Sequence, residues 1–575
     1  MRLQRIPGTH ARTLVIIAIL ACLDACAPSR VAVPRESAPG AASKLAPLST
    51  HREQTVEQQA THVLSRLAFG ARPGDIDKVR AMGVDAWITR QLEPERIADP
   101  GVDAVVARLA VSTETAKHLV DQYPPQDIWI RRLRTERSIP VAAQFLPTAE
   151  DSVAYKALTA QGSRYADQMM ALRVARSQIS ERQLLEVMTD FWENHFSVFN
   201  GKMPTRFTML EYDRDVIRPH ALGHFRELLG AVAHSPAMLY YLDNYQSVAD
   251  STHLTVNEWK QAQRTKMRPE IRRRNGLNEN YGRELLELHT LGVDGGYTQQ
   301  DVIEVARALT GWTIQTPREG GAFLFRPEAH DAEAKTVLGH ELPAGRGVED
   351  GDAVLDIIAR HPSTARYIAR KLAMRLVSDT PSAQLIEHAA RAFRDSDGDI
   401  RATLRVIIMS GEFFAHASYR AKVKSPFEYV VSLRRALDAL PDTTPRSAQA
   451  MGRLGQPLWG KLTPNGWPET GDTWMNTGAI LNRINFAVQV GSGRFPDTAV
   501  EMWPPWRSLA MATFDQQVDG VVDQLLAGDS SRETRAILVA GHNPLVPAGA
   551  ATVAARPNLR DLVGLALGSP EFQRR

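Results

Sequence analysis

The residues with the clearest potential for chemistry lie in one predicted helix near the middle of the chain, residues 277–292. At about 100° per residue, Asn280, Glu284 and Glu287 fall within about 60° of one another on one face of this helix. Two carboxylates beside an apolar stripe are an arrangement that shifts a pKa or holds a cation. His289 lies about 160° from Glu287, so one helix cannot bring both to the same ion. The alternative interpretation is structural, with both glutamates paired to nearby arginine side chains.

Histidines elsewhere in the chain provide candidate metal ligands. His195 lies on an apolar helix face, where either a ligand or a hydrogen-bonded core histidine is expected. His220 and His224 are four residues apart, a spacing that lets two imidazoles reach one metal, although the pair lacks the Glu of a metalloprotease motif. The only cysteines, Cys22 and Cys26, precede this region, so a metal would bind histidine together with carboxylate or amide oxygen. Such ligands suit zinc, iron or manganese.

These motifs define a candidate site built from several helices. We expect a polar cleft in which a glutamate acts as general base or metal ligand, a histidine as ligand or acid, and an arginine as an anion clamp. The candidate catalytic residues are Glu284, Glu287, Arg283 and His289; the candidate metal ligands are His195, His220, His330 and Asp331; and further polar candidates are Asn194, Asp243, Asn244 and Asn280. We further expect the glutamate stripe of the central helix to face the same cavity as His195 or His220.

A tryptophan-rich segment offers a second type of binding surface. Trp459, Trp467 and Trp474 lie in a stretch that also contains the turn-forming residues 464–468. Aromatic side chains in a loop can line a groove for a sugar or a peptide, and packing over the core is the equal alternative.

The elements that must position these side chains are predicted to be helices. From about residue 51 the apolar residues recur with a helical period, and helix starts are indicated at Ser235, Thr298 and Ser425. Strand-like alternation is scarce, and residues 321–326 are the best short candidate. We therefore predict a mainly α fold, a single large multi-helix domain with long loops and at most a small β-hairpin.

The first residues of the chain carry a targeting pattern. Residues 1–25 have a basic flank and an apolar run too short to span a bilayer, as in a signal peptide. The sequence Leu-Asp-Ala-Cys that ends at Cys26 resembles a bacterial lipobox; Cys22 closes a second possible box, and an ordinary signal peptide is the alternative. Residues 26–50 read as the lipidated cysteine and a flexible tether rich in Pro, Ala and Ser. We expect an exported, lipid-anchored protein, placed at the outer membrane if the cell has two membranes.

Composition narrows the possible classes of protein. The chain has 575 residues, of which 43% are apolar and 23% charged, with a formal net charge of +3. These values exclude wholesale disorder, collagen and coiled-coil arrays. The near-neutral charge argues against a dedicated nucleic-acid-binding protein, which carries a strongly basic domain. Length alone would suggest about three or four domains.

Several motifs occur in an order that is similar to a known family. They are Phe191-Trp192-x-Asn194-His195-Phe196, residues 217–223, Tyr241-Leu242-Asp243-Asn244, residues 278–292, residues 306–312, His330-Asp331, residues 335–339 and residues 424–428. The chain resembles the large bacterial family numbered 1800 among the domains of unknown function, from about His62 to the C-terminus. The resemblance implies one continuous helical domain, which we place at residues 51–575. His224 stands where members commonly carry Asn, which weakens the His220–His224 metal pair.

The resemblance implies a location and a partner but no reaction. Members are typically exported and often neighbour a second exported protein that resembles sulfatases and phosphatases. We therefore expect a metal-assisted hydrolase of an envelope or extracellular polymer, with a divalent metal bound by histidine and carboxylate. The alternative is a non-catalytic scaffold or binding module for the co-exported partner. A solvent-reachable cluster of the motif residues would favour the hydrolase, whereas full burial with mutual pairing would favour the scaffold.

Overall fold

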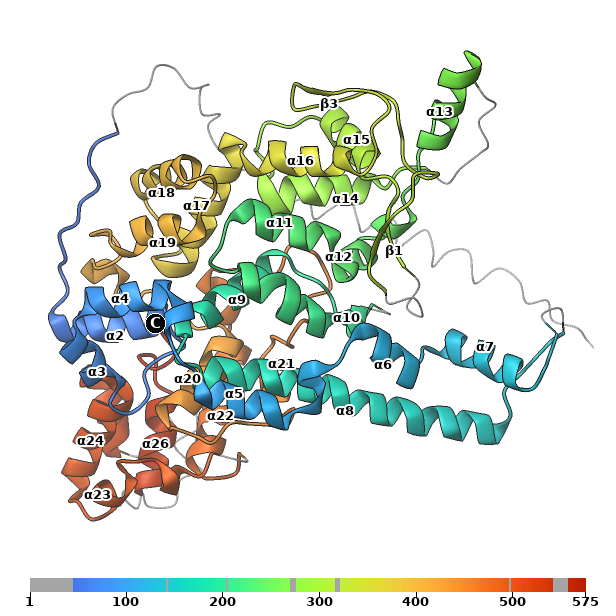
Figure 1. Ribbon diagram of the computed structural model, residues 1–575. Coiled ribbons are helices and arrows are strands. Elements are labelled where there is room, and N and C mark those ends of the chain that lie inside the picture. Colours follow the sequence, from blue (N-terminus) through green and yellow to red (C-terminus); the bar gives the residue numbers. More distant parts are fainter. Residues whose placement is uncertain are drawn as a thin grey trace, which may run out of the picture. The chain divides into compact units, whose positions relative to one another are not determined.

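The computed structural model describes residues 45–140, 143–202, 205–268, 276–315, 321–495, 498–540 and 557–575. The chain divides into two compact units, Met1–Pro47 and Leu48–Arg575, and every helix and strand of Figure 1 belongs to the second. The predicted lipidation site, Cys26, and its alternative, Cys22, lie outside the described residues.

The second unit is mainly α-helical, as the sequence predicts (Figure 1). Its first helices are α2 (Val56–Arg66), α3 (Asp75–Met82), α4 (Val84–Leu92), α5 (Pro100–Arg108), α6 (Ala116–Gln122), α7 (Gln126–Glu136), α8 (Ala149–Ile179), α9 (Gln183–His195), α10 (Thr205–Glu211), α11 (Phe225–His234), α12 (Pro236–Tyr241), α13 (Val256–Thr265) and α14 (Glu279–Glu284). They are followed by α15 (Gln299–Ala308), α16 (Glu349–Ala359), α17 (Pro362–Leu376), α18 (Ala383–Asp395), α19 (Ile400–Ile408), α20 (Pro426–Ala436), α21 (Arg446–Arg453), α22 (Thr477–Gly491), α23 (Trp506–Ala510), α24 (Phe514–Leu526), α25 (Arg532–Ala540) and α26 (Leu559–Leu567).

The helix starts read from the sequence are found in the structure. The Ser235 side chain caps α12, and Thr298 and Ser425 form capping boxes at the starts of α15 and α20. In the second of these boxes, Ser425 Oγ accepts from the Glu428 backbone N–H at 3.2 Å, and Glu428 Oε2 accepts from the Ser425 N–H at 2.8 Å. Each box satisfies two backbone donors that a helix N-terminus leaves without partners.

The predicted helix over residues 277–292 is divided into two parts. Helix α14 runs directly into a π-helical turn, Leu285–Thr290, in which the Thr290 hydroxyl donates to the Leu285 carbonyl at 2.6 Å. A π-helical turn contains more residues than an α-helical one, so each residue turns the chain by less than the 100° that the sequence argument assumed. The angles beyond Glu284 therefore differ somewhat from those of a regular α-helix. His289 still faces away from Glu287, because it is 1% exposed in the protein interior while Glu287 is half-buried at the surface.

Two small antiparallel sheets accompany the helices. Strand β1 (Trp312–Ile314) pairs with β2 (Phe323–Phe325), which lies within the predicted 321–326 strand. Strand β3 (Lys335–Val337) pairs with β4 (His340–Leu342) across a tight turn. The sequence predicted at most one hairpin because strands of three residues are too short to show an alternating pattern.

Two hydrophobic clusters form the core of the second unit. The larger one is built from α2 to α19, and the smaller one from α20 to α26 with additions such as Phe69. Helices α23, α24 and α26, at the red end of the colour scale, lie together at the lower left of Figure 1. Helix α9 contributes to both clusters, with Leu184, Phe191 and Trp192 in the larger and Val187 in the smaller. The polar side chains of α9 therefore lie where the two clusters meet.

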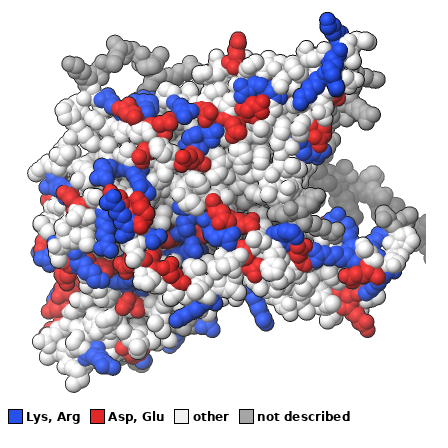
Figure 2. All heavy atoms as spheres, viewed as in Figure 1, with Lys and Arg blue, Asp and Glu red and all other residues white. Residues whose placement is uncertain are grey.

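Charged side chains of both signs are interspersed over the face shown in Figure 2. A basic strip at the upper right of that face lies over α13, a helix that carries Lys260 and Arg264. None of the helices in the described ranges combines the length and the apolar character that crossing a bilayer requires.

Candidate functional site

The glutamates of the central helix lie at its surface. Glu284 and Glu287 are both half-buried, and Asn280 is exposed. Glu287 accepts a hydrogen bond from the Tyr297 hydroxyl at 3.2 Å. Burial raises the pKa of Glu284, and the nearby charge of Glu287 raises it further. Arg283 donates to Gln299 at 2.6 Å, so it is not aimed at an anion held by the glutamates.

His195 and His289 lie close together in the protein interior. The Nε2 atom of His195 lies 3.0 Å from the His289 carbonyl oxygen, so Nε2 carries the proton and donates to it. The Nδ1 atom then accepts from Lys371 Nζ at 2.8 Å. Burial lowers the pKa of His195 well below its usual range, lowers that of His289 to about 3, and lowers that of Lys371 to about 8. Both imidazoles are neutral at pH 7, and both nitrogens of His195 already have partners.

The remaining predicted site residues of this part of the chain are dispersed. His220 Nδ1 contacts the Val216 carbonyl oxygen at 2.8 Å, whereas the exposed His224 contacts the Asp397 carbonyl oxygen at 3.1 Å. Asp243, also exposed, forms an ion pair with Lys202 at 2.7 Å. The buried Asn244 donates from Nδ2 to the carbonyl oxygens of Leu309 and Trp312, each at 3.2 Å. These side chains hold neighbouring segments together and do not converge on one point.

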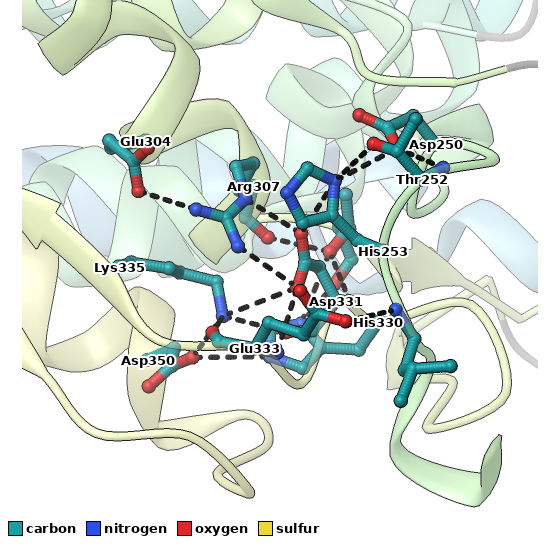
Figure 3. Close-up of polar contacts among 12 residues, drawn as sticks. Asp250, Thr252, His253, Glu304, Arg307, His330, Asp331, Glu333, Lys335 and Asp350 are labelled. Carbon is teal, nitrogen blue, oxygen red and sulfur yellow. Dashed lines mark hydrogen bonds and ion pairs between the residues drawn. The ribbon is translucent and has the colours of Figure 1, made fainter. Parts of the chain in front are cut away.

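His330 and Asp331 belong to a buried ion-pair network, shown in Figure 3. Arg307 Nε donates to Asp331 Oδ2 at 2.7 Å, and Lys335 Nζ donates to Asp350 Oδ2 at 2.8 Å. The Lys335 ammonium also donates to the Asp331 carbonyl oxygen at 2.6 Å, and His330 Nε2 lies 3.4 Å from Asp350 Oδ2. The Arg307 and Lys335 side chains occupy the positions that a metal cation would need beside these carboxylates.

The predicted metal ligands therefore do not fit a metal ion. In the part of the chain that the structure describes, no three side chains of His, Cys, Asp or Glu are placed to hold one. His195 uses both ring nitrogens, and the Asp331 carboxylate is bound by a guanidinium. We derive no reaction step through a metal.

A cavity of about 710 Å³ lies close to this histidine pair, and we call it the larger cavity. It is enclosed by α9, α17, α20, the loop of residues 456–475, here the Trp loop, and the C-terminal residue. Its charged and aromatic lining consists of Asp190, Glu193, Glu428, Glu469, Arg375, Arg575, Lys461, Phe427, Trp459, Trp467 and Trp474. Carboxyl groups, basic groups and aromatic rings thus all line the larger cavity.

The Trp loop is held against the end of α9 by Asn194. The Asn194 side chain accepts from the Trp467 N–H at 2.6 Å and donates to the Trp467 carbonyl oxygen at 2.8 Å. Gly466 has φ +70°, and a Cβ atom there would lie 2.2 Å from the Asn194 carbonyl oxygen. Only glycine allows this approach. Asn194, a predicted site residue, thus positions the loop that forms one wall of the larger cavity.

Arg375 joins three carboxylates in the larger cavity. Its guanidinium lies 2.8 Å from Asp190, 3.0 Å from Glu428 and 3.2 Å from Glu469. Arg575 adds a second guanidinium 3.0 Å from Glu428. Burial alone would raise the pKa of Glu428, but the charges of Arg375 and Arg575 lower it to about 2. Glu428 is ionised throughout the physiological range.

Glu193 has the opposite protonation state. Burial raises its pKa to about 8, and the ion pair with Arg173, at 2.9 Å, only partly offsets this effect. Its side chain is 6% exposed, and Oε1 has no hydrogen-bond partner among the described residues. The larger cavity therefore places a carboxyl group with a raised pKa, Glu193, beside one with a lowered pKa, Glu428, and general acid–base catalysis relies on such a difference. Burial also raises the pKa of Asp190.

Helix α17 links the predicted residues to the larger cavity. Tyr367, Lys371 and Arg375 are spaced by four residues and share one face of the helix. The Tyr367 hydroxyl donates to the Leu288 carbonyl oxygen at 3.2 Å, Lys371 contacts His195, and Arg375 reaches the cavity.

The sequence analysis missed most of the carboxyl groups in the larger cavity. Asp190 and Glu193 precede Asn194 by four residues and by one, so a polar stripe on that helix was visible. Glu428 lies three residues after Ser425, where the sequence indicates only a helix start, and Glu469 lies between Trp467 and Trp474 without an acidic motif. Arg375 had no local signal, because its role depends on partners far away in the sequence.

A model of a protein family, described as "Protein of unknown function (DUF1800)", matches residues 62–574. Comparison with curated proteins and with solved structures found no similar chain. The matched range includes every residue that lines the larger cavity except Arg575.

Proposed function

Because the chain belongs to the DUF1800 family, whose description assigns no function, we propose its function from the chemistry of the larger cavity. We propose a hydrolase that cleaves glycosidic bonds in an envelope or extracellular polysaccharide. The arrangement that carries this proposal is the buried carboxyl group of Glu193, whose pKa is raised, in a tryptophan-lined cavity that also contains the ionised carboxylate of Glu428. Pairs of carboxyl groups with opposite protonation states are typical of glycoside hydrolysis.

The proposed reaction uses two carboxyl groups and one water molecule. Glu193 donates its proton to the glycosidic oxygen as the bond to the anomeric carbon breaks. Glu469, which is ion-paired with Arg375 at 3.2 Å, accepts a proton from the water whose oxygen bonds to that carbon. Glu469 then releases to solvent the proton that it took from the water, and the Glu193 carboxylate takes up a proton from solvent, so both groups return to their starting states. Arg375 keeps the negative charge of Glu469 in place between turnovers.

The tryptophans favour a sugar as the substrate. Trp459, Trp467 and Trp474 all line the larger cavity, and aromatic faces pack well against the apolar faces of sugar rings. Lys461 lies over the Trp467 ring at 4.9 Å and adds a hydrogen-bond donor at the same wall. An apolar surface with a few polar groups is the usual form of a small-molecule site.

A non-catalytic scaffold is the second candidate function, and a specific observation favours it. The network around His330 and Asp331 is fully buried and mutually paired (Figure 3). Buried polar networks of this kind fix helix packing without any reaction. In this case the protein would bind a co-exported partner that resembles sulfatases and phosphatases. For both candidate functions we propose the same location: the protein is exported and is anchored to a membrane by a lipid on Cys26.

The test is a search for new reducing ends after the purified protein is mixed with cell-wall and extracellular polysaccharides. We expect turnover by the wild type and a loss of about 10²–10⁴-fold in Glu193→Gln, because the amide cannot donate the proton. The exposed Glu181→Gln is the matched control and keeps full activity. Turnover by Glu193→Gln at the wild-type rate would contradict the role of Glu193. If the wild type shows no turnover, and if the wild type and Glu193→Gln bind the co-exported partner equally well, the result would support the scaffold.

A further inference from the structure

A second, smaller cavity, with room for about one water-sized group, also has Glu428 in its lining. It is lined by α2, α9 and the start of α20, and it shares Glu428 and Arg575 with the larger cavity. Phe69 and Val187 supply apolar walls. We call it the smaller cavity. The proposed hydrolysis assigns no role to it.

The smaller cavity contains an arginine without a carboxylate partner. Arg66 is 0% exposed, and its Nη2 atom donates to the Ser418 carbonyl oxygen at 2.6 Å. Its Nε and Nη1 atoms have no hydrogen-bond partner among the described residues. Within those same ranges, no acidic side chain lies at ion-pair distance from it. Arginine stays protonated in proteins, so its charge must be compensated in another way.

Two further basic groups face the same space. Lys424 is 7% exposed and donates to Ser432 Oγ and to the Phe572 carbonyl oxygen, each at 2.7 Å, and the described residues offer it no carboxylate within 4 Å. Arg575 is paired with Glu428 at 3.0 Å, but its Nε atom lacks a partner in the described part of the chain.

The charges around the smaller cavity do not balance. Three basic side chains face one carboxylate, Glu428, which is also bound by Arg375 at 3.0 Å from the larger cavity. The same excess of positive charge helps to lower the pKa of nearby basic groups. The pKa of Lys424 is lowered to about 7 by burial and by neighbouring basic side chains that include Arg575. The pKa of His62 is lowered by burial and by the charge of Arg66.

We propose that the smaller cavity is a binding site for a monovalent anion of the chloride class, held by Arg66, Lys424 and Arg575. The enclosed space is small and has apolar walls, so a weakly hydrated single-atom anion enters it at a lower desolvation cost than a phosphate or sulfate dianion. The carboxylate of Glu428 also lines the cavity, and it repels a dianion more strongly than a monovalent ion. The free N–H groups of Arg66 and Arg575 are the donors that such an ion requires.

The first test measures thermal unfolding of the full mature protein at constant ionic strength, with sodium chloride replaced stepwise by sodium gluconate. We expect the midpoint to rise with the logarithm of the chloride concentration above the dissociation constant, by about 2 °C at a concentration about 100-fold above it. Arg66→Met should abolish this dependence, because it removes the charge that needs compensation. Arg434→Met is the matched control, since Arg434 is equally buried but does not line the smaller cavity.

The second test does not depend on the stability of a variant. A crystal of the wild-type protein soaked in bromide should give an anomalous peak within hydrogen-bonding distance of Arg66 and Arg575. A midpoint that is equal in chloride and gluconate, or a bromide map with no peak between these groups, would overturn the proposal. Equal loss of the chloride effect in Arg66→Met and Arg434→Met would also overturn it. Neither test involves turnover, so failure of the proposed hydrolysis leaves both results interpretable.

Discussion

Individual carboxyl groups around the larger cavity respond to pH in opposite directions. Glu193 has a pKa of about 8 in the folded protein, against about 4.3 in an unfolded chain. Between these values the folded state keeps a proton that the unfolded state has released, so stability falls as pH rises. We predict that Glu193→Gln loses less stability than the wild type as pH rises and that it is more stable than the wild type at pH 8. The midpoint of thermal unfolding, measured from pH 5 to pH 9, checks this prediction, and Glu181→Gln should follow the wild-type curve.

Arg375 is the residue whose removal should cost the most stability. Arg375→Met leaves Asp190, Glu428 and Glu469 buried without this shared cation, and breaking a buried ion pair by removing one partner costs about 3–5 kcal/mol. The loss should be smaller at pH 5 than at pH 8, because freed carboxylates take up protons as pH falls. Urea unfolding at both pH values measures the difference.

A control for this prediction lies on the same helix. Arg366 forms an exposed ion pair with Glu387 at 2.6 Å, and exposed pairs contribute about 0–1 kcal/mol. Arg366→Met should therefore unfold at nearly the wild-type urea concentration. Equal effects of the two substitutions would show that the network around the larger cavity contributes little to stability.

At the scale of elements, the Trp loop depends on one side chain. Asn194→Ala removes both hydrogen bonds to the Trp467 backbone and leaves that N–H and C=O without partners. We predict a loss of about 2–4 kcal/mol, from about 1–3 kcal/mol for each unsatisfied buried group, and a shift of tryptophan fluorescence to longer wavelength as the loop opens. An unchanged emission spectrum would show that the loop is held by other contacts. The exposed Asn465→Ala, in the same loop, is the control.

The elements also show how far the sequence could predict the structure. Helix starts at Ser235, Thr298 and Ser425 were predictable because a cap and its partner are only three residues apart. The π-helical turn at Leu285–Thr290 was not, because a regular helical period assumes a constant pitch.

The candidate site was predictable only in part, for a related physical reason. Asn194 and His195 belong to a local motif; the structure places Asn194 in the lining of the larger cavity and His195 against Lys371, on the helix that carries Arg375. The partners of Arg375 come from α9, α20 and the Trp loop, and pairing over such distances leaves no trace in a single sequence. His330 and Asp331 were proposed as metal ligands because the pattern could not show that Arg307 and Lys335 fill the same space.

At the scale of the whole molecule, both hydrophobic clusters and both cavities belong to the unit Leu48–Arg575. The proposed lipid attachment at Cys26 lies in the other unit. We predict that Cys26→Ser loses palmitate labelling and membrane fractionation while its thermal midpoint stays within about 1 °C of the wild-type value, because surface changes away from the core alter stability little. Cys22→Ser is the control and should keep its label. Labelling retained in Cys26→Ser and lost in Cys22→Ser would move the attachment site to Cys22.

The position of Arg575 has a consequence for the order in which the protein folds. Its guanidinium contacts Glu428, and its backbone N–H and C=O pair with Lys422 at 2.8 Å and 3.2 Å. The smaller cavity also takes its lining from Arg66, which lies about 500 residues earlier in the chain. Contacts over such a separation form late, because closing a long loop costs conformational entropy. A partly folded chain can therefore form the helices of both clusters while the wall between the two cavities is still open.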